Sequence, residues 1–379
     1  MRKKLRSFII FGVFSLIVIT SLIPFSLAKQ RRNYLTDFII STRIEQSGFS
    51  NSKVASSFSY EATVDALSIL DYFDLFEEQT DIWGNIKDNV NTTQFQNSLK
   101  GKISPLFSQS GAIIYDLYYL YSSLDLLDYS ISSGDKVLTM LYLEKTNRTM
   151  GGFAPTNVTT SASLISTYYV IQLYSQIGML NSINKTLHKE WVLNCFNSDG
   201  GFGGNSSSPS TLANTYYGLL ALEALGSLNE LPNPSKTMNY LKSFYISDES
   251  DLENYGGYAA DNYTTTAFLS STYYCVKALE LLDADDQLND EETIEWVLSR
   301  QNFEDGGFTE NSDGADQRSS SVTSSYFAFE ILNTFDSELS MLNEDIWMVE
   351  FSWLILLIVL SVIGVIIIIM IVIWRKRRV

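Results

Sequence analysis

A turn of two glycines and one aromatic residue recurs through the chain and constrains its fold more than any other feature. It occurs at Gly151-Gly152-Phe153, Gly200-Gly201-Phe202, Gly256-Gly257-Tyr258 and Gly306-Gly307-Phe308. The first glycines of these copies are 49, 56 and 50 residues apart. Each copy follows a helix-like segment and precedes a second, more apolar segment. Self-similarity at this period predicts one helical hairpin that is stacked repeatedly.

The apolar segment after each turn carries two adjacent aromatic residues behind a Thr or a Ser. These signatures are Thr167-Tyr168-Tyr169, Thr215-Tyr216-Tyr217, Thr272-Tyr273-Tyr274 and Ser325-Tyr326-Phe327. The second aromatic residue of the first three lies 17 residues after one of the two turn glycines. We therefore expect Tyr169, Tyr217 and Tyr274 at similar depth around one axis.

Between residues 33 and 342 the sequence predicts six helical hairpins of about 50 residues each. The second helix of each hairpin is apolar on nearly all sides, which indicates burial of both faces, while the first carries more charge. We therefore predict an all-α fold, an α/α toroid of about six hairpins with inner and outer rings of helices. The predicted pairs are residues 38–40 with 60–76, 95–99 with 113–127, 136–144 with 164–177, 187–195 with 212–225, 237–244 with 268–282, and 291–301 with 322–332. The turn is reduced to Ser47-Gly48-Phe49 in the first hairpin and to Gly101 in the second.

Both ends of the chain have the pattern of membrane-directed segments. Residues 1–28 begin with a basic stretch and continue without charge to Ser26-Leu27-Ala28, which predicts a signal peptide, cleaved after Ala28, or an N-terminal anchor. Residues 351–374 are uncharged and precede Arg375-Lys376-Arg377-Arg378. They predict a transmembrane helix over residues 346–374 and a cytoplasmic basic tail, residues 375–379.

This topology places residues 29–345 outside the cytoplasm, with the membrane as a partner through the C-terminal helix. Six Asn-x-Ser/Thr sequons agree with an exterior location and predict glycosylation at Asn91, Asn147, Asn157, Asn184, Asn205 and Asn262. The formal net charge is −17, and since the two basic ends carry eight positive charges, the part between them carries −25. Such an acidic domain argues against nucleic acid as a partner.

The sixth repeat carries a motif that points to a known family. Gln301-Asn302-Phe303-Glu304-Asp305-Gly306-Gly307-Phe308 is similar to the Gln-to-Trp repeat of squalene cyclases, with Phe in place of Trp. Two inner segments end in Ala-Leu-Glu, at residues 221–223 and 278–280. With its Tyr-rich inner helices, the region of about residues 35–340 resembles the repeats of protein prenyltransferase β subunits and squalene cyclases.

The resemblance implies a zinc site that the chain does not reproduce. Prenyltransferases hold zinc with Asp and Cys near the start of one inner helix and His near the start of another, where this chain has residues 269–272 (Leu-Ser-Ser-Thr) and 322–325 (Val-Thr-Ser-Ser). The only histidine, His188, lies on an outer segment. The basic residues that hold diphosphate after the turn are also missing. We expect no metal site of this kind, no zinc cofactor and no zinc-dependent prenyl transfer.

The cyclases protonate their substrate with an Asp-x-Asp-Asp motif, and Asp283-Ala284-Asp285-Asp286 has the same letters. It follows an inner helix, however, whereas the cyclase motif opens one at the cavity. Asp283, Asp285 and Asp286 are therefore weak catalytic candidates, and a solvated acidic loop is the favoured interpretation. A calcium ion in such a loop stays open as an alternative, although the spacing of an EF-hand is absent.

An aromatic inner wall remains. By resemblance, the residues that face the central cavity are Tyr119, Tyr169, Tyr217, Tyr274 and Phe327. These rings could bind an isoprenoid or another apolar ligand, or they could simply fill a closed core. The first hypothesis is a membrane-anchored toroid that binds a lipid, an isoprenoid or a protein partner without zinc-dependent catalysis. The alternative is an isoprenoid-processing enzyme, cyclase- or transferase-like, or a glycan enzyme that uses carboxylates in the cavity.

Overall fold

The computed structural model describes residues 28–347, except residues 56, 77–78, 81–85, 88–89, 110, 112, 303 and 312–318. It divides into two compact units, residues 31–343 and the two chain ends, residues 1–30 with 344–379. In the unit of the chain ends, strand β1 (Ala28–Gln30) pairs antiparallel with β6 (Asp345–Trp347). Of the predicted signal peptide, residues 1–28, the structure describes only Ala28, in β1, and of the predicted transmembrane segment, residues 346–374, only Ile346 and Trp347, in β6. The rest of both segments and the basic tail, residues 375–379, lie outside the described residues. None of the helices in the described part combines the length and the apolar character needed to cross a bilayer.

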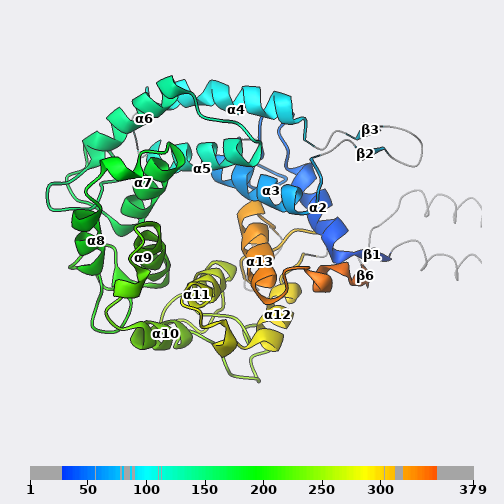
Figure 1. Cartoon of the computed structure of the whole chain (residues 1–379). Coiled ribbons are helices and arrows are strands. Elements are labelled where there is room, and N and C mark those ends of the chain that lie inside the picture. The colour runs from blue at the N-terminus through cyan, green and yellow to red at the C-terminus, as the bar shows by residue number, and fades with distance from the viewer. Residues whose placement is uncertain are drawn as a thin grey trace, which may run out of the picture. The chain divides into compact units, whose positions relative to one another are not determined.

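The larger unit consists of helical hairpins that form two concentric rings (Figure 1). The outer helices are α2 (Arg31–Ser41), α4 (Thr92–Leu106), α6 (Ser133–Thr146), α8 (Lys185–Leu193), α10 (Pro234–Lys242) and α12 (Asp290–Ser299). The inner helices are α3 (Tyr60–Tyr72), α5 (Ile113–Leu126), α7 (Leu164–Gln176), α9 (Leu212–Ala224), α11 (Leu269–Leu281) and α13 (Val322–Phe335). Each inner helix packs against the next, and α13 packs against α3, so the inner ring is closed. The predicted α/α toroid is confirmed.

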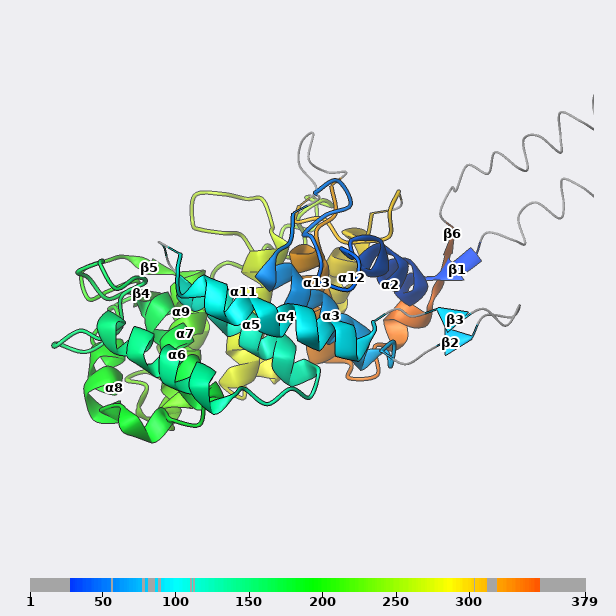
Figure 2. The same ribbon diagram turned by 90° about the horizontal axis from the view of Figure 1, so that it is seen from above.

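Short strands and 3-10 turns occupy the connections between these helices. Strand β2 (Gln79–Thr80) pairs with β3 (Ile86–Lys87), and β4 (Phe202–Gly203) pairs with β5 (Ser210–Thr211). The side view shows the β4–β5 loop and the loops between α2 and α3 and between α10 and α11 along the same rim of this unit (Figure 2). These loops carry the repeated turns.

The paired glycines let each turn approach the next outer helix. Gly256 has φ +92°, and a Cβ atom there would lie 2.2 Å from the carbonyl oxygen of Glu292 on α12. Gly306 has φ +90° and approaches Tyr34 on α2 in the same way, at 2.5 Å. Only glycine combines this left-handed backbone with such a close contact. The sixth turn therefore packs on the first outer helix and closes the outer ring as well.

A side-chain hydrogen bond fixes the register between each turn and the inner helix that follows. The backbone N–H of Phe153 donates to Thr167 Oγ1 at 2.9 Å, and the N–H of Phe202 donates to Thr215 Oγ1 at 3.0 Å. Equivalent bonds join Tyr258 to Thr272, Phe308 to Ser325 and, in the first repeat, Phe49 to Thr63. Since the hydroxyl residue directly precedes the two cavity-facing positions in these five repeats, this bond places those positions at the same level of the ring.

The second hairpin differs from the prediction. The turn expected at Gly101 is wrong, because Gly101 lies inside α4 and the chain turns only after Leu106. Gly101 is exposed, and a Cβ atom there would have no neighbour within 4 Å. An exposed helical glycine lowers helix stability by only about 1 kcal/mol relative to alanine, which neighbouring contacts offset here.

Candidate ligand-binding cavity

Aromatic side chains from five inner helices surround a cavity of about 130 Å³. All five residues expected from the sequence line it, and the first aromatic residue of each pair lines it too. The aromatic wall consists of Tyr118, Tyr119, Tyr168, Tyr169, Tyr216, Tyr217, Tyr273, Tyr274, Tyr326 and Phe327. Glu61, Val64, Asp65 and Ser68 on α3, Ser122 on α5 and Leu220 on α9 complete the lining.

A chain of hydrogen bonds joins the second aromatic residues of three repeats to a carboxylate. The hydroxyl of Tyr119 donates to Glu61 Oε1 at 3.0 Å. The hydroxyl oxygens of Tyr119 and Tyr169 are 2.7 Å apart, and those of Tyr169 and Tyr217 are 3.1 Å apart. A phenol has one proton to donate. Because Tyr119 gives its proton to Glu61, Tyr169 donates to Tyr119 and Tyr217 donates to Tyr169, so all three bonds point towards Glu61.

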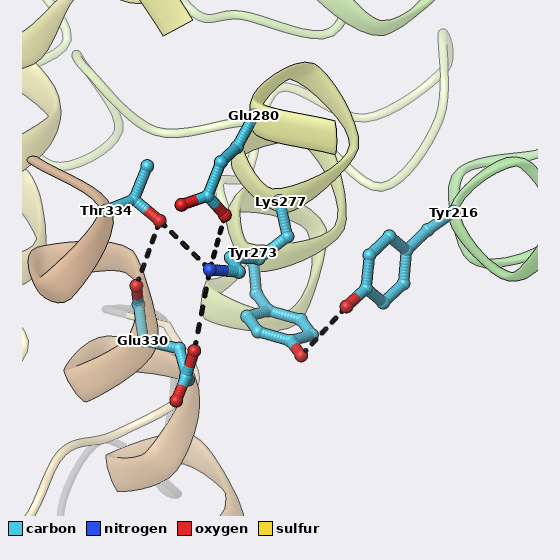
Figure 3. Close-up of polar contacts among 6 residues, drawn as sticks. All are labelled: Tyr216, Tyr273, Lys277, Glu280, Glu330 and Thr334. Atoms are coloured by element: carbon cyan, nitrogen blue, oxygen red, sulfur yellow. Dashed lines mark hydrogen bonds and ion pairs between the residues drawn. The ribbon is translucent and has the colours of Figure 1, made fainter. Parts of the chain in front are cut away.

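The first aromatic residues form a second set of contacts. The hydroxyl oxygens of Tyr216 and Tyr273 are 3.2 Å apart (Figure 3). The ring of Tyr273 also stacks on that of Phe327, with centroids 4.7 Å apart. Burial raises the pKa of Tyr273 and Tyr217 well above the usual value. These phenols therefore stay protonated at physiological pH and present neutral rings and hydroxyl groups to the cavity.

The first repeat breaks the aromatic ring with an acid. Thr63 makes the register bond of its repeat, so Val64 and Asp65 occupy the two positions that hold aromatic residues in the other repeats. Asp65 thus stands where Tyr169, Tyr217, Tyr274 and Phe327 stand. The same backbone scaffold carries a carboxyl group here and a ring elsewhere.

Asp65 is buried, with 5% of its surface exposed, and Thr323 donates a hydrogen bond to its Oδ2 at 3.0 Å. Burial, assisted by the nearby charge of Glu61, raises the pKa of Asp65 well above its usual value. Glu61 is exposed although it lines the cavity, which places it at the opening. The surrounding walls still shield the carboxyl group of Glu61 from part of the solvent, and this raises its pKa. The hydrogen bond from Tyr119 lowers the pKa, but by less.

A charged cluster lies one helical turn beyond Tyr273 and Tyr326. Lys277 on α11 forms an ion pair with Glu280 and another, at 3.5 Å, with Glu330 on α13 (Figure 3). It also donates to Thr334 Oγ1 at 3.2 Å. None of these four residues lines the cavity. The charge of Lys277 is therefore compensated within this cluster.

The acidic motif named in the sequence lies elsewhere. Asp283 directly follows the C-terminal cap of α11, with φ +52°, and Asp285 and Asp286 belong to a 3-10 turn, residues 285–287. All three side chains are exposed and none lines the cavity. Their position at the end of an inner helix favours the interpretation as a solvated loop.

The stretches that match the zinc-binding positions of prenyltransferases lie at the starts of α11 and α13 and contain no Cys, Asp, Glu or His. In the part of the chain that the structure describes, no three His, Cys, Asp or Glu side chains come together as a metal site would require. His188 is on α8, where its ring stacks on Phe153 at 4.3 Å and Nδ1 accepts the N–H of Gly152. It supports a turn on the rim. The two cysteines, Cys195 and Cys275, are buried and unpaired.

The sequons lie on connections and helix caps. Five of their asparagines are exposed, Asn147, Asn157, Asn184, Asn205 and Asn262, whereas Asn91 is half-buried. The Oδ1 atoms of Asn91 and Asn184 cap α4 and α8, which leaves their amide nitrogens outside the cap. Glycosylation at these positions stays a prediction.

Sequence reasoning missed Glu61 and Asp65. The signal was present, because Ser59 and Thr63 repeat the Ser163 and Thr167 pattern of the third repeat. Aligning Thr63 with Thr167 would have placed Asp65 at the level of Tyr169. The degenerate turn with the single glycine Gly48 obscured this alignment.

Comparison with known proteins agrees with the fold. Protein geranylgeranyltransferase-I of Candida albicans, in complex with GGPP, superposes with a TM-score of 0.58 at 14% identity, covering 74% of this chain and 84% of that chain. The type II terpene cyclase MstE from Scytonema, without ligand, superposes with a TM-score of 0.52 at 14% identity, covering 82% and 97%. At these identities the similarity shows the fold alone.

Among curated protein sequences, none is significantly similar to this chain. The profile of one domain family, the Prenyltransferase alpha-alpha toroid domain, matches residues 2–110, 86–187, 174–262 and 258–351. These overlapping matches extend over most of the chain. The chain belongs to the prenyltransferase α/α toroid domain family.

Proposed function

We propose that this protein is a membrane-anchored, extracytoplasmic binding toroid that holds a small group of a ligand in its aromatic cavity and acts without zinc. The observation that carries the proposal is the lining of the cavity. Five inner helices contribute aromatic pairs at one level, and α3 contributes Asp65 at the same level. A wall of rings with one buried acid suits the selective binding of a ligand better than it suits plain packing.

The size of the cavity limits the ligand. Sites for whole small molecules measure about 300–1,000 Å³, whereas this cavity measures about 130 Å³. An engineered cavity of about 150 Å³ in another protein binds benzene. We therefore expect the cavity to hold one small group, of a few heavy atoms, rather than a long isoprenoid chain. The remainder of a larger ligand, a lipid or a protein segment, would lie outside the opening beside Glu61.

The proposed topology rests on the two ends of the sequence. The uncharged segment before Ala28 directs export, the apolar segment over residues 346–374 anchors the chain, and residues 375–379 stay in the cytoplasm. The exposed sequons would then carry glycans. A tag after Val379 should resist protease added to intact cells, whereas the toroid should be digested. Protection of the toroid together with digestion of the tag would contradict this topology.

A second candidate, acid catalysis in the cavity, is favoured by one observation. Since burial raises the pKa of Asp65, its carboxyl group keeps its proton to a higher pH than an exposed aspartate does and could donate that proton to a bound group. The cavity, at about 130 Å³, is too small to hold an isoprenoid substrate. Turnover of a small alkene or acetal by the protein, lost in Asp65→Asn, would favour catalysis over binding alone.

The binding proposal is tested with the full chain in dodecyl maltoside micelles. Ligand-observed NMR with small probes, one of them phenol, measures whether any probe of benzene size occupies the cavity. We expect binding that is weakened in Tyr217→Ala. The absence of binding for every probe, neutral or cationic, would contradict the proposed function.

A further inference from the structure

We propose that the group held by the cavity is a small organic cation, an alkylammonium or trimethylammonium group, bound between the aromatic wall and the carboxylate of Asp65. This inference rests on the proposed function and deepens it by naming the class of ligand. Three features of the lining lead to it: its charge, its rings and its size.

The charge of the lining has one sign. Two of the residues that the structure places around the cavity are acids, Glu61 and Asp65, and none of the residues around it is Lys, Arg or His. Lys277, one helical turn beyond Tyr273 on α11, is engaged by Glu280 and Glu330. An anionic group would therefore meet buried acids without a compensating base, whereas a cation would meet its counter-charge.

The rings provide the second feature. Faces of Tyr and Phe attract a cation, more strongly when water is excluded, and cages of such rings bind quaternary ammonium groups. Here the rings of Tyr169, Tyr217 and Tyr274 follow one another with centroids 5.6 and 6.0 Å apart. Their phenols stay neutral because burial raises the pKa of each. The wall therefore brings several neutral aromatic rings together around the cavity.

The size of the cavity is the third feature. A trimethylammonium group resembles benzene in bulk, and about 130 Å³ accommodates a group of this kind. A hydrated metal cation would need several oxygen ligands within reach. The described residues contain no group of three or more such side chains around a metal position. An organic cation needs only one carboxylate and ring faces.

Binding of a cation replaces the proton of Asp65. The titratable groups that face Asp65 are Glu61 on α3, Tyr119 on α5, and Tyr326 and Glu330 on α13. Burial and the charges of Glu61 and Glu330 raise the pKa of Asp65, against the hydrogen bond from Thr323, and so favour its protonated form in the empty cavity. The ionised form binds the cation better, so affinity should rise with pH and binding should release a proton.

The experiment compares choline with 3,3-dimethylbutan-1-ol, which has the same shape without the charge. The full chain is kept in dodecyl maltoside, a detergent without an ammonium group, and dissociation constants are measured by ligand-observed NMR. We expect choline to bind at least about ten-fold more tightly than the alcohol. Equal binding of both would overturn the cation assignment and leave the proposed function standing. Binding of neither would overturn both.

Substitutions in the lining test whether choline binding depends on the carboxylate of Asp65. Asp65→Asn should weaken choline binding at least about ten-fold and leave the binding of the alcohol unchanged. Glu61→Gln should also weaken choline binding, but less, and it provides the test if Asp65→Asn does not fold. The control Glu249→Gln removes one exposed carboxylate outside the cavity and should change neither constant. Unchanged choline affinity in folded Asp65→Asn would overturn the proposal.

Discussion

The rim of the toroid and its cavity are built from the same repeats but follow opposite rules. On the rim, the turn glycines meet the next outer helix so closely that a Cβ at Gly256 would lie 2.2 Å from a carbonyl oxygen. In the cavity, the rings of Tyr169 and Tyr217 pack side by side with centroids 5.6 Å apart, and the space that they line stays open. The Gly-Gly-aromatic turn recurs in the last four repeats, whereas the cavity wall changes from aromatic pairs to Val64 and Asp65 in the first repeat. The difference indicates that the fold depends on the rim and leaves the wall free for function.

The largest expected effect concerns the rim. Gly256→Ala combines a left-handed backbone with a clash against the carbonyl of Glu292, and it should lower the free energy of unfolding by about 3–5 kcal/mol. The control Gly101→Ala lies in an open helical position and should raise stability by about 0.5–1 kcal/mol. Chemical denaturation of both variants measures the contrast. Similar, small effects at the two glycines would show that the rim is not tightly packed.

The rim should also have its own pH dependence. Burial lowers the pKa of His188 to about 4, below its usual value of about 6.5. The unfolded chain therefore binds the proton first, so this part of stability is present above pH 6.5 and is lost as the pH falls towards 4. The loss should reach roughly 3 kcal/mol relative to His188→Asn, which cannot titrate. A constant difference between the two proteins over this range would contradict the prediction.

The cavity wall should tolerate truncation better than the rim. Tyr217 borders the cavity and is half-buried, while Tyr258 anchors a turn with 1% of its surface exposed. Tyr258→Ala should lower the free energy of unfolding by about 3–5 kcal/mol, and Tyr217→Ala by about 1–2 kcal/mol. Equal losses, measured by urea denaturation, would mean that the wall is packed core.

Asp65 should show the opposite pH dependence from His188. Its raised pKa means that the unfolded chain ionises first, above about pH 4, while the folded carboxyl keeps its proton. Stability is therefore lost as the pH rises through this range, and the loss is complete above the folded pKa. Asp65→Asn should be more stable than the parent at pH 7 and equal to it near pH 3. Lower stability of the variant at pH 7 would show that Asp65 acts as a structural carboxylate.

The sequence predicts the rim more completely than the wall, for physical reasons. Most hairpins follow from the spacing of the glycine turns, because only glycine fits the close contacts that those turns make. The resemblance to a known family led to the five wall residues, which are Tyr119, Tyr169, Tyr217, Tyr274 and Phe327. Gly101 misled the prediction because an exposed helix tolerates glycine. Asp65 escaped notice because a carboxylate in a helix usually indicates a solvated face. The hydrogen bond of Thr63 shows that Asp65 lies at the same level as the rings, as an alignment of Thr63 with Thr167 would have indicated.

The central claim is that the aromatic wall surrounds a usable cavity. Val64 stands at the position of Tyr168 and its counterparts, so Val64→Tyr would complete the aromatic ring on α3 and fill the space. The most direct measurement is the affinity of the full chain for choline before and after this substitution, with thermal unfolding recorded in parallel. The account predicts that the variant folds with stability within about 1 kcal/mol of the parent and loses binding at least about ten-fold. Unchanged affinity in a folded variant would contradict it.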